Sequence, residues 1–178
     1  KIKKEPALKE TIALLQKHSR IVVFTWHAEL AKWLYKKLSN LTSLIREVTG
    51  KSASIFGPAD RDMPIEKRKD LASQFAVCSC GVYVATLASV GTSINALAAA
   101  DAGFMTELSW NTVRLIQGEN RIQREGCPHQ VVHMYYLICR NTVDDVFLRT
   151  LEAKVEVITQ VSPHDLDGDY LVRDLSPS

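Results

Sequence analysis

Residues 20–34 read RIVVFTWHAELAKWL and contain the repeating unit of the whole chain. Ile21 to Phe24 form a short apolar run, which indicates a strand buried on both faces of a sheet. From about Ala28 the apolar residues recur at helical spacing, with lysines on the other side. A buried strand followed directly by a helix is the unit from which parallel sheets are built.

Four further apolar runs follow, and helical patterns separate them. The expected strands are residues 54–56, 82–85, 102–106 and 131–138. The expected helices are residues 6–18, 28–50, 64–75, 96–100 and 111–123, with a last one that Thr142 would cap. This alternation predicts an α/β fold with a mostly parallel sheet of about five or more strands and helices on both faces.

Composition describes an ordinary globular chain. Its 178 residues are 46% hydrophobic and 24% charged, and the formal net charge is +2. That length suits one domain, and the small positive charge permits a nucleic-acid partner without requiring one. No apolar run approaches the roughly 18 residues of a membrane span, so we expect no membrane contact. The chain begins with lysine, and we expect it to be a piece of a longer protein.

The cysteines predict no metal site. Cys78 and Cys80 are two positions apart, which is the wrong spacing for a common zinc pair, and Cys127 and Cys139 stand alone. Reduced, mostly buried thiols in an intracellular protein are the expected state.

Residues 117–126, QGENRIQREG, carry an unusual row of side chains. Gln117, Arg121 and Arg124 are spaced four and then three positions apart, which would place them on one face of a helix. Guanidinium groups offer a fixed fork of donors that matches phosphate oxygens. The row therefore favours a polyanion site, although the pattern alone is also compatible with a solvated helix face.

Polar and small residues follow the expected strands. Ligands of parallel sheets gather at the carboxyl ends of the strands, so these segments should share one edge. They are residues 25–27, 57–58, 86–95 and 108–111. The third, TLASVGTSIN, is rich in small hydroxyl residues that let backbone N–H groups approach a phosphate, or it is simply a turn into a helix.

No phosphate-binding GxxxxGK[ST] loop occurs in the chain, and no strand ends in paired acids that would hold Mg²⁺. Arginines suited to phosphate without a loop to hold that phosphate suggest half of a site. We expect a domain that supplies arginine fingers, across an interface, to a nucleotide held by another domain.

The order of these segments resembles the second, C-terminal RecA-like lobe of a superfamily-two helicase, specifically of the Swi/Snf-type double-stranded DNA translocases, over about residues 7–158. Within that family the nearest likeness is to the annealing-helicase branch. The segments that resemble the family's successive motifs are RIVVFTWHAELAKWL for motif IV, IFGPADRDMPIEKRKDLASQF for a G…R…F segment, VYVATLASVGTSINALAAAD for motif V, ELSWNTVRLIQGENRIQREG for the Trp-Asn element and motif VI, and VVHMYYLICRNTVDDVFLRTLEAK for the closing strand and helix.

The resemblance implies a role for each matching position. Arg124 would be the finger on the γ-phosphate of ATP, and Arg121 would act nearby on the phosphates or the lobe interface. Gln117, Gly91 and Asn95 would support the nucleotide cleft. The positions expected to contact DNA are Thr25, Trp26, Gly57, Thr86, Trp110 and Asn111.

Two motifs depart from the family pattern. Residues 89–95, SVGTSIN, keep one of the three glycines usual in motif V. In motif VI, Gln123 stands where the family has His, Glu125 replaces an apolar residue, and Cys127 replaces a Gln. Within the G…R…F segment, a basic cluster is either a solvated face or a contact to the DNA backbone, and it consists of Arg61, Lys67, Arg68 and Lys69.

The resemblance makes residues 1–159 a RecA-like three-layer lobe and leaves residues 160–178 as an extension or linker. It implies an ATP hydrolase in the full-length protein, with Mg²⁺ held by an N-terminal lobe of the same polypeptide. Duplex DNA would bind through its phosphate backbone, in the cytoplasm of a bacterium or phage host or in a nucleus. The fragment alone is expected to be inactive.

Other functions remain open at this stage. A degenerate lobe could serve as a DNA-binding or protein-interaction module without turnover, and an RNA helicase lobe has a related motif order. A small-molecule Rossmann-type enzyme would need a GxGxxG loop, which the sequence lacks. Asp144 and Asp145 look like paired catalytic acids, but at a helix start they are expected to be structural, as is His133 within a strand.

Overall fold

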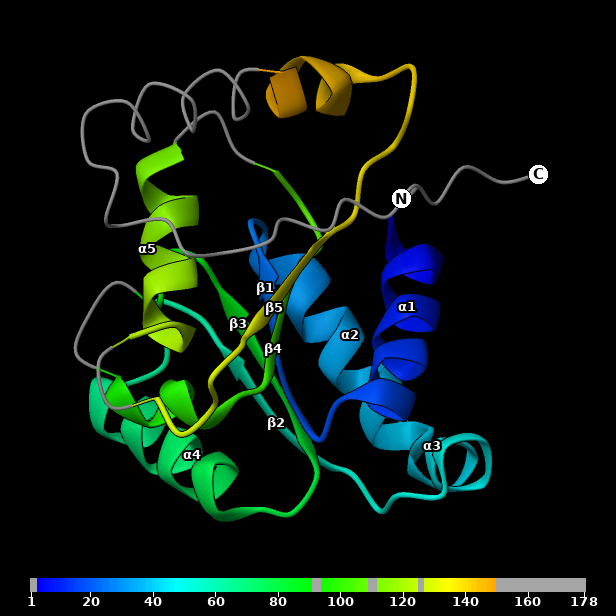
Figure 1. The fold of residues 1–178 in the computed structure, drawn as a ribbon, viewed down its shortest axis with the longest axis vertical. Helices are drawn as coiled ribbons and strands as arrows, with labels where there is room; N and C mark the ends of the chain where they lie inside the picture. The colour runs from blue at the N-terminus through cyan, green and yellow to red at the C-terminus, as the bar shows by residue number, and fades with distance from the viewer. Residues whose placement is uncertain (1–2, 91–93, 109–111, 125–126, 150–178) are drawn as a thin grey trace.

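Five strands lie side by side in one parallel sheet in the order β2-β3-β1-β4-β5. The computed structural model describes residues 3–90, 94–108, 112–124 and 127–149 (Figure 1). The strands are β1 (Arg20–Thr25), β2 (Ser54–Ala59), β3 (Gly81–Thr86), β4 (Ala102–Met105) and β5 (His133–Tyr136). The predicted α/β fold with a parallel sheet of about five strands is confirmed, although β5 is shorter than residues 131–138.

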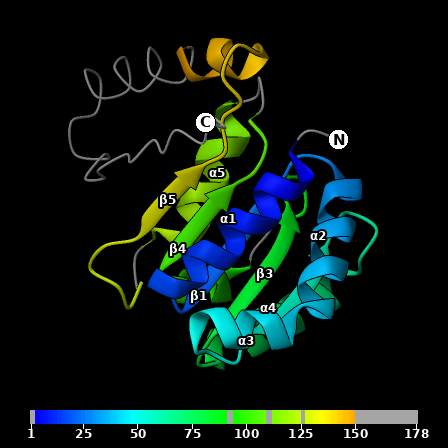
Figure 2. The same cartoon turned by 90° about the vertical axis from the view of Figure 1, so that its right-hand side faces the viewer.

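Helices cover both faces of the sheet. They are α1 (Lys4–Lys17), α2 (Ala28–Asn40), α3 (Thr42–Thr49), α4 (Ile65–Val77), the 3₁₀ helix η1 (Asn95–Ala99) and α5 (Thr112–Ile122). Helices α1, α2 and α3 pack on one face, and α4, η1 and α5 pack on the other (Figures 1 and 2). Residues 143–149 are also helical.

Strand β1 occupies the centre and explains the continuous apolar run from Ile21 to Phe24. Val22 and Phe24 belong to the core beneath α4 and α5, whereas Ile21 and Val23 belong to the core beneath α1 and α2. All four side chains are fully buried. A strand covered on both faces has no polar side, and the period-two alternation of a half-exposed strand is therefore missing.

The predicted helix over residues 28–50 is wrong in one respect, because it is two helices that separate at Leu41. The Leu41 N–H binds the Leu38 carbonyl at 3.1 Å, and the Leu41 backbone (φ −107°, ψ 15°) leaves the helical region. Ser39 and Asn40 precede the break, and their short polar side chains compete with helical hydrogen bonds.

The prediction that residues 57–58 follow the second strand is also wrong. Strand β2 continues through Gly57 and Pro58 to Ala59, and its pairing with β3 shifts register between Phe56 and Ala59. The Gly57–Pro58 peptide bond is cis. Proline is tolerated here because β2 is an edge strand.

The segment before and within the last helix matches the predicted cap. The Thr142 hydroxyl accepts the Asp144 N–H at 3.2 Å, and the Asp145 carboxylate accepts the Asn141 N–H. The buried Asp144 carboxylate also pairs with Lys3 and accepts the Cys139 N–H at 3.0 Å. Asp144 and Asp145 therefore have the structural roles expected of them.

The helical spacing of the apolar residues in this helix predicts a buried stripe of Val143, Val146, Phe147, Leu151, Val155 and Ile158, and this prediction is only partly correct. Phe147 is buried, but Val143 and Val146 are 53% and 51% exposed. The helical spacing of apolar residues cannot distinguish the side that meets the sheet from its flank. The remaining members of the stripe, Leu151, Val155 and Ile158, lie outside the described residues, as does the predicted boundary at residue 159.

Candidate functional site

Hydrogen bonds connect the loops that follow β1, β3 and β4 where they leave the carboxyl edge of the sheet. Thr25 and Thr86, the last residues of β1 and β3, lie opposite each other in register. The Thr25 carbonyl accepts the Leu87 N–H at 2.8 Å. The Phe24 carbonyl accepts the Thr106 N–H at 3.0 Å and the Thr106 hydroxyl at 2.9 Å. The loops after β1, β3 and β4 thus leave the sheet already bound to one another.

Thr25 and Thr86 themselves are buried. The Thr25 hydroxyl donates to the His27 carbonyl at 3.1 Å. The Thr86 hydroxyl has no hydrogen-bond partner within the part of the chain that the structure describes. In this conformation neither hydroxyl is presented to a ligand, so contact of these loops with DNA would have to come through neighbouring groups.

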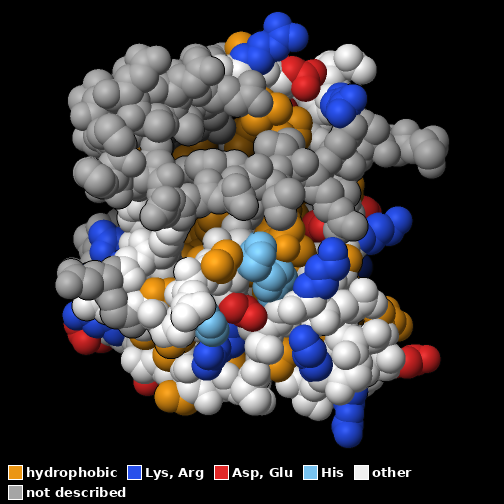
Figure 3. All heavy atoms as spheres, viewed as in Figure 1, with side chains coloured by type: hydrophobic (Ala, Val, Ile, Leu, Met, Phe, Trp, Pro, Cys, Tyr) orange, Lys and Arg blue, Asp and Glu red, His pale blue; other side chains and the backbone are white. Residues whose placement is uncertain are grey.

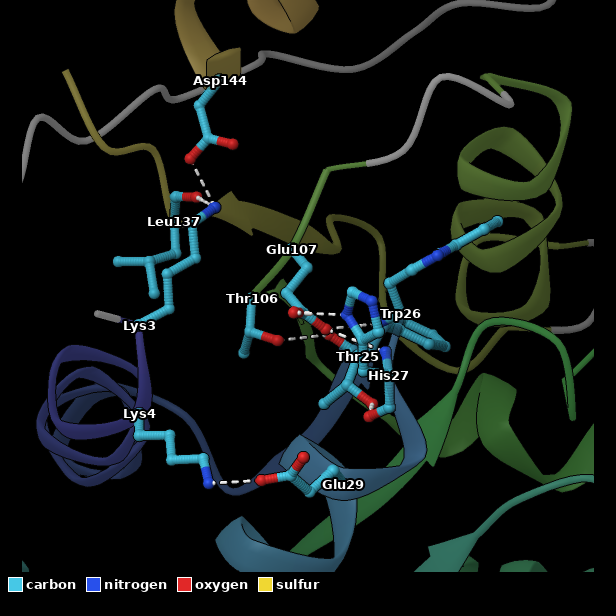
Figure 4. A network of polar contacts seen from close by, with 11 residues as sticks. Lys3, Lys4, Thr25, Trp26, His27, Glu29, Thr106, Glu107, Leu137 and Asp144 are labelled. Carbon is cyan, nitrogen blue, oxygen red and sulfur yellow. Dashed lines mark hydrogen bonds and ion pairs between the residues drawn. The ribbon is translucent and has the colours of Figure 1, made fainter. Parts of the chain in front are cut away.

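A carboxylate from the β4 loop holds the turn between β1 and α2 (Figure 4). Glu107 Oε2 accepts the backbone N–H groups of Trp26 at 2.8 Å and His27 at 2.9 Å. Glu107 Oε1 lies 2.8 Å from His27 Nδ1. Sequence reasoning missed Glu107 as a functional residue. Its one signal was its place at the start of the segment ELSWN, and its partners lie 80 positions away.

Trp26 also meets helix α5 through its ring. The guanidinium carbon of Arg114 lies 5.4 Å from the centroid of the half-buried Trp26 ring, a distance typical of a cation–π contact. Trp26 is therefore fixed by Glu107 at its backbone and by Arg114 at its side chain.

Arg68 ties helix α4 to the loop after β3. Its Nε donates to the Met63 carbonyl at 3.1 Å, and its Nη1 donates to the Ser89 carbonyl at 2.6 Å. The Ser89 hydroxyl lies 2.8 Å from each of two carbonyl oxygens, those of Ala59 and Thr86. The guanidinium of Arg68 is thus engaged within this domain, so a fully solvated face does not describe this member of the basic cluster, and its contact with DNA stays a prediction.

Arg124 and Asn95, two of the predicted site residues, meet directly. Arg124 Nη1 donates a hydrogen bond to Asn95 Oδ1. Both side chains are exposed, and Asn95 is the first residue of η1. Two residues that the resemblance assigns to motifs VI and V therefore share one point of the surface.

The three residues of the Gln-Arg-Arg row do not all lie on one helix. Gln117 and Arg121 lie on α5, but that helix ends at Ile122, so the predicted common helix face is wrong for Arg124. The Gln123 N–H still binds the Glu119 carbonyl at 2.9 Å, and the Cys127 N–H binds the Arg124 carbonyl at 3.0 Å. Pro128, which cannot donate a helical hydrogen bond, follows one residue later.

Gly118 lets α5 approach the sheet closely. A Cβ atom at Gly118 would stand 2.9 Å from Leu87 Cδ2 and 3.0 Å from Met105 Cε. The next residue, Glu119, accepts a hydrogen bond from the Tyr136 hydroxyl of β5. Burial raises the pKa of Glu119, and the Tyr136 bond lowers it by less. These contacts fix the position of α5 relative to β3, β4 and β5.

Four predicted site residues are not part of this arrangement. Gly91, Trp110 and Asn111 lie outside the described residues. Gly57 lies inside β2, not in a loop, and its backbone faces strand β3. A Cβ atom there would stand 2.4 Å from the Val84 carbonyl oxygen, so the structure gives Gly57 a packing role.

Among the residues described, no group of three or more His, Cys, Asp or Glu side chains is arranged to hold a metal ion. None of the described helices is long and apolar enough to cross a membrane. The four cysteines are free thiols, and Cys80 is buried. Lys and Arg side chains are spread over the face in Figure 3 and do not form one stripe.

Two relatives by sequence are ATPases or regulators of chromatin. Over 149 residues, or 83% of this chain, the sequence is 28% identical to the SWI/SNF-related matrix-associated actin-dependent regulator of chromatin subfamily A-like protein 1 of Drosophila melanogaster. Over 125 residues, or 70% of this chain, it is 26% identical to the chromatin-remodeling ATPase INO80 of Mus musculus. The matches span only 18% and 8% of the lengths of these relatives. No protein-family model matches the sequence.

Among solved structures, the C-terminal part of the Fun30 ATPase domain superposes with a TM-score of 0.67. The superposition covers 83% of this chain and 44% of that chain, at 18% identity. Identity this low shows the fold alone, and the fold is the one predicted.

Proposed function

We propose that the chain is a Swi/Snf-type C-terminal RecA-like lobe of superfamily two and forms the second lobe of an ATP-dependent double-stranded DNA translocase, because it is similar in sequence to SWI/SNF-related and INO80 proteins and similar in fold to the C-terminal part of the Fun30 ATPase domain. The N-terminal lobe of the same polypeptide would hold ATP and Mg²⁺. The observation that carries the proposal is the contact of Arg124 with Asn95, which brings the candidate finger to the loop expected to follow DNA.

The chemistry required of this lobe is electrostatic. Transfer of the γ-phosphoryl group of ATP spreads negative charge over its oxygens, and a guanidinium supplied across an interface stabilises that charge. Arg124 is exposed at the end of α5 and keeps its charge at every physiological pH, so it can reach outward to a nucleotide on a facing lobe. Arg121, one turn earlier, would act on the phosphates or on the lobe interface.

Coupling to DNA would use the Asn95 contact. When the lobes close, Arg124 would exchange its hydrogen bond to Asn95 for hydrogen bonds to a phosphate. Asn95 lies in the segment that resembles motif V and is the first residue of η1, so that exchange would release this segment beside the expected DNA path. Tracking along a duplex needs contacts to the phosphate backbone, and binding should therefore be salt-sensitive and weakly sequence-specific.

The test is ATP hydrolysis by the full parent polypeptide, with and without duplex DNA, for wild type and Arg124→Ala. We expect DNA to stimulate turnover and the substitution to lower it by about 10³–10⁵-fold, the range known for supplied arginine fingers, while a fluorescent ATP analogue still binds. Arg46→Ala is the matched control, because Arg46 is exposed on α3, far from the carboxyl edge. The 178-residue fragment alone should not hydrolyse ATP.

The same experiment separates the alternative function. A lobe retained only as a DNA-binding or protein-interaction module would give no DNA-stimulated turnover, and Arg124→Ala would change nothing in hydrolysis. The single motif V glycine is the feature that favours this alternative. Because the relatives are named as regulators or remodelers of chromatin, we propose a site of action inside the cell, where the DNA is.

A further inference from the structure

Glu107 joins two loops of the carboxyl edge, and none of the roles proposed above uses it. We infer that Glu107 is a positioning residue for DNA, which fixes the Trp26–His27 turn so that this turn and the Trp26–Arg114 pair meet a phosphate backbone in one defined arrangement. The inference rests on the proposed DNA-binding function and names the residue on which its geometry depends.

The carboxylate satisfies donors that the helix cannot satisfy. Trp26 and His27 precede α2, and backbone N–H groups at the start of a helix have no partner within it. Glu107 Oε2 accepts both, at 2.8 and 2.9 Å, and Oε1 contacts His27 Nδ1 at 2.8 Å. Three contacts to one ionised group at these distances are short and strong, so they hold the turn in a single conformation.

Glu107 is itself held in place by the sheet. Thr106, the residue before Glu107, is bound to the Phe24 carbonyl of β1 through both its N–H and its hydroxyl (Figure 4). The side chain of Glu107 is only 19% exposed, whereas that of His27 is 68% exposed. The carboxylate that holds the turn is thus mostly shielded from solvent, and the turn that it positions faces outward.

The outward side has the chemistry of a backbone contact. Arg114 carries a permanent positive charge and lies over the Trp26 ring, so the position of Trp26 is one of the contacts that place this cation. The negative charge of Glu107 is itself directed at three contacts within the lobe. Glu107 can therefore set the position of the cation without presenting its own charge to a phosphate.

A different reading of the same contacts predicts the opposite sign. If Glu107 merely occupied donors that would otherwise bind a phosphate, its removal would free them and DNA would bind more tightly. If Glu107 positions the turn, its removal weakens DNA binding. The direction of the change in affinity decides between the two.

The experiment uses the full parent polypeptide and a labelled duplex. Two quantities are measured, the DNA concentration that half-saturates ATP hydrolysis (KM for DNA) and the anisotropy of the duplex without nucleotide. We expect Glu107→Ala to raise the KM for DNA about tenfold, with kcat changed by less than about twofold, because the lost contacts act on binding and not on the chemical step. Glu107→Gln keeps an oxygen for the backbone donors and should restore most of the affinity.

Two further variants separate charge and folding from positioning. Glu29→Ala removes an equal charge from the first turn of α2, where Glu29 forms an ion pair with Lys4, and should leave the KM for DNA unchanged. His27→Ala removes the ring contact but keeps both backbone bonds, and should raise the KM by about two- to threefold. It tests the inference even if Glu107→Ala does not fold.

The inference is overturned if Glu107→Ala leaves the KM for DNA unchanged or lowers it, whether or not the melting temperature falls. It is also overturned if Glu29→Ala has the same effect, since charge alone would then explain the result. A wild-type protein that neither binds duplex DNA nor responds to it would refute the proposed function itself, and the inference with it.

Discussion

Similar polar contacts have different roles at the amino-terminal ends of the strands (the amino edge) and at their carboxyl-terminal ends (the carboxyl edge). At the amino edge, Asp101 accepts the N–H groups of Ser19 at 3.0 Å and Arg20 at 2.8 Å, and Arg20 Nη1 donates to the Ala76 carbonyl at 2.9 Å. At the carboxyl edge, Arg124 is exposed and donates to the neutral amide of Asn95, which another acceptor can replace. Contacts with backbone groups fix the fold, whereas a contact with an exchangeable side chain leaves a group available.

The amino edge also brings aromatic and imidazole groups together. His18 Nε2 lies 2.8 Å from the Tyr135 hydroxyl oxygen, and the His18 and His133 ring centroids are 5.1 Å apart. Figure 3 shows histidine side chains gathered beside an acidic side chain on this face. His133 thus has the structural surroundings expected of it. These contacts join β1 to β5 across β4, so we expect substitutions here to act on stability.

The largest expected difference between the edges is between two arginines. Arg124→Ala should lower ATP turnover of the parent protein by about 10³-fold or more and change the free energy of unfolding by less than about 0.5 kcal/mol. Arg20→Ala should cost about 1.5–3 kcal/mol of stability through its lost carbonyl contacts, with turnover per folded molecule unchanged. Urea denaturation and steady-state hydrolysis on both variants check this. Equal losses of turnover would contradict the comparison.

A substitution of Gly57 tests how closely strands β2 and β3 are packed midway between the amino and carboxyl edges. Its φ of +122° is unfavourable for any residue with a Cβ atom, which would also collide with the Val84 carbonyl oxygen. Gly57→Ala should therefore cost about 3 kcal/mol or more. Gly50→Ala is the control, because Gly50 has a φ of +69° but no atom within 4 Å of the added Cβ, and should cost about 1–2 kcal/mol. Similar losses in denaturation would refute the packing role of Gly57.

Asp101→Asn should change how the free energy of unfolding depends on pH, because Asp101 holds the amino edge together. Burial would raise the pKa of Asp101, but the interaction with His18 and the hydrogen bonds from Ser19 and Arg20 lower it well below its ordinary value of 3.8. Its stabilisation is therefore present above about pH 4 and is lost as the pH falls further. Asp101→Asn should cost about 1.5–3 kcal/mol at pH 7 and progressively less below pH 4. Asp70→Asn, on exposed α4 surface, should show no such dependence.

Glu119→Gln should change the free energy of unfolding least, and it should raise stability at pH 7 where Asp101→Asn lowers it. Because burial raises the pKa of Glu119 above its ordinary value of 4.5, the folded state favours the protonated acid. Wild-type stability from this group is present below pH 4.5 and declines as the pH rises. Gln mimics the neutral acid and should stabilise the lobe by under about 1 kcal/mol at pH 7, with no gain near pH 4. Denaturation midpoints at several pH values test this, with exposed Glu66→Gln as control.

Buried strands and their order along the chain were readable from the sequence, because local composition decides them. The run from Ile21 to Phe24 is apolar for the same reason that it is central, and no partner need be known to recognise it. The break at Leu41 and the passage of β2 through Gly57 and Pro58 were not readable. Both depend on packing against the neighbouring strand and helices, and the local sequence pattern does not contain that information.

The sequence predicted the site residues that belong to a motif. It did not predict the roles of residues whose partners lie far away in the sequence. Asn95 and Arg124 were named from motifs, and they meet in the structure. Glu107 and Arg68 were not assigned their positions, because their hydrogen-bond partners are 80 and 21 residues away. Arg124 was placed on the helix face because spacing alone does not mark the residue at which α5 ends.

Pro58 has a consequence for how these lobes behave when crowded together. Strand β2 is an edge strand, and a regular edge offers a row of free N–H and carbonyl groups to any other strand that approaches. Pro58 lacks an N–H, and the register shift between Phe56 and Ala59 interrupts the row at the same place. An incoming strand would lose its ladder midway, so this side of the sheet resists the edge-to-edge pairing that leads to aggregation.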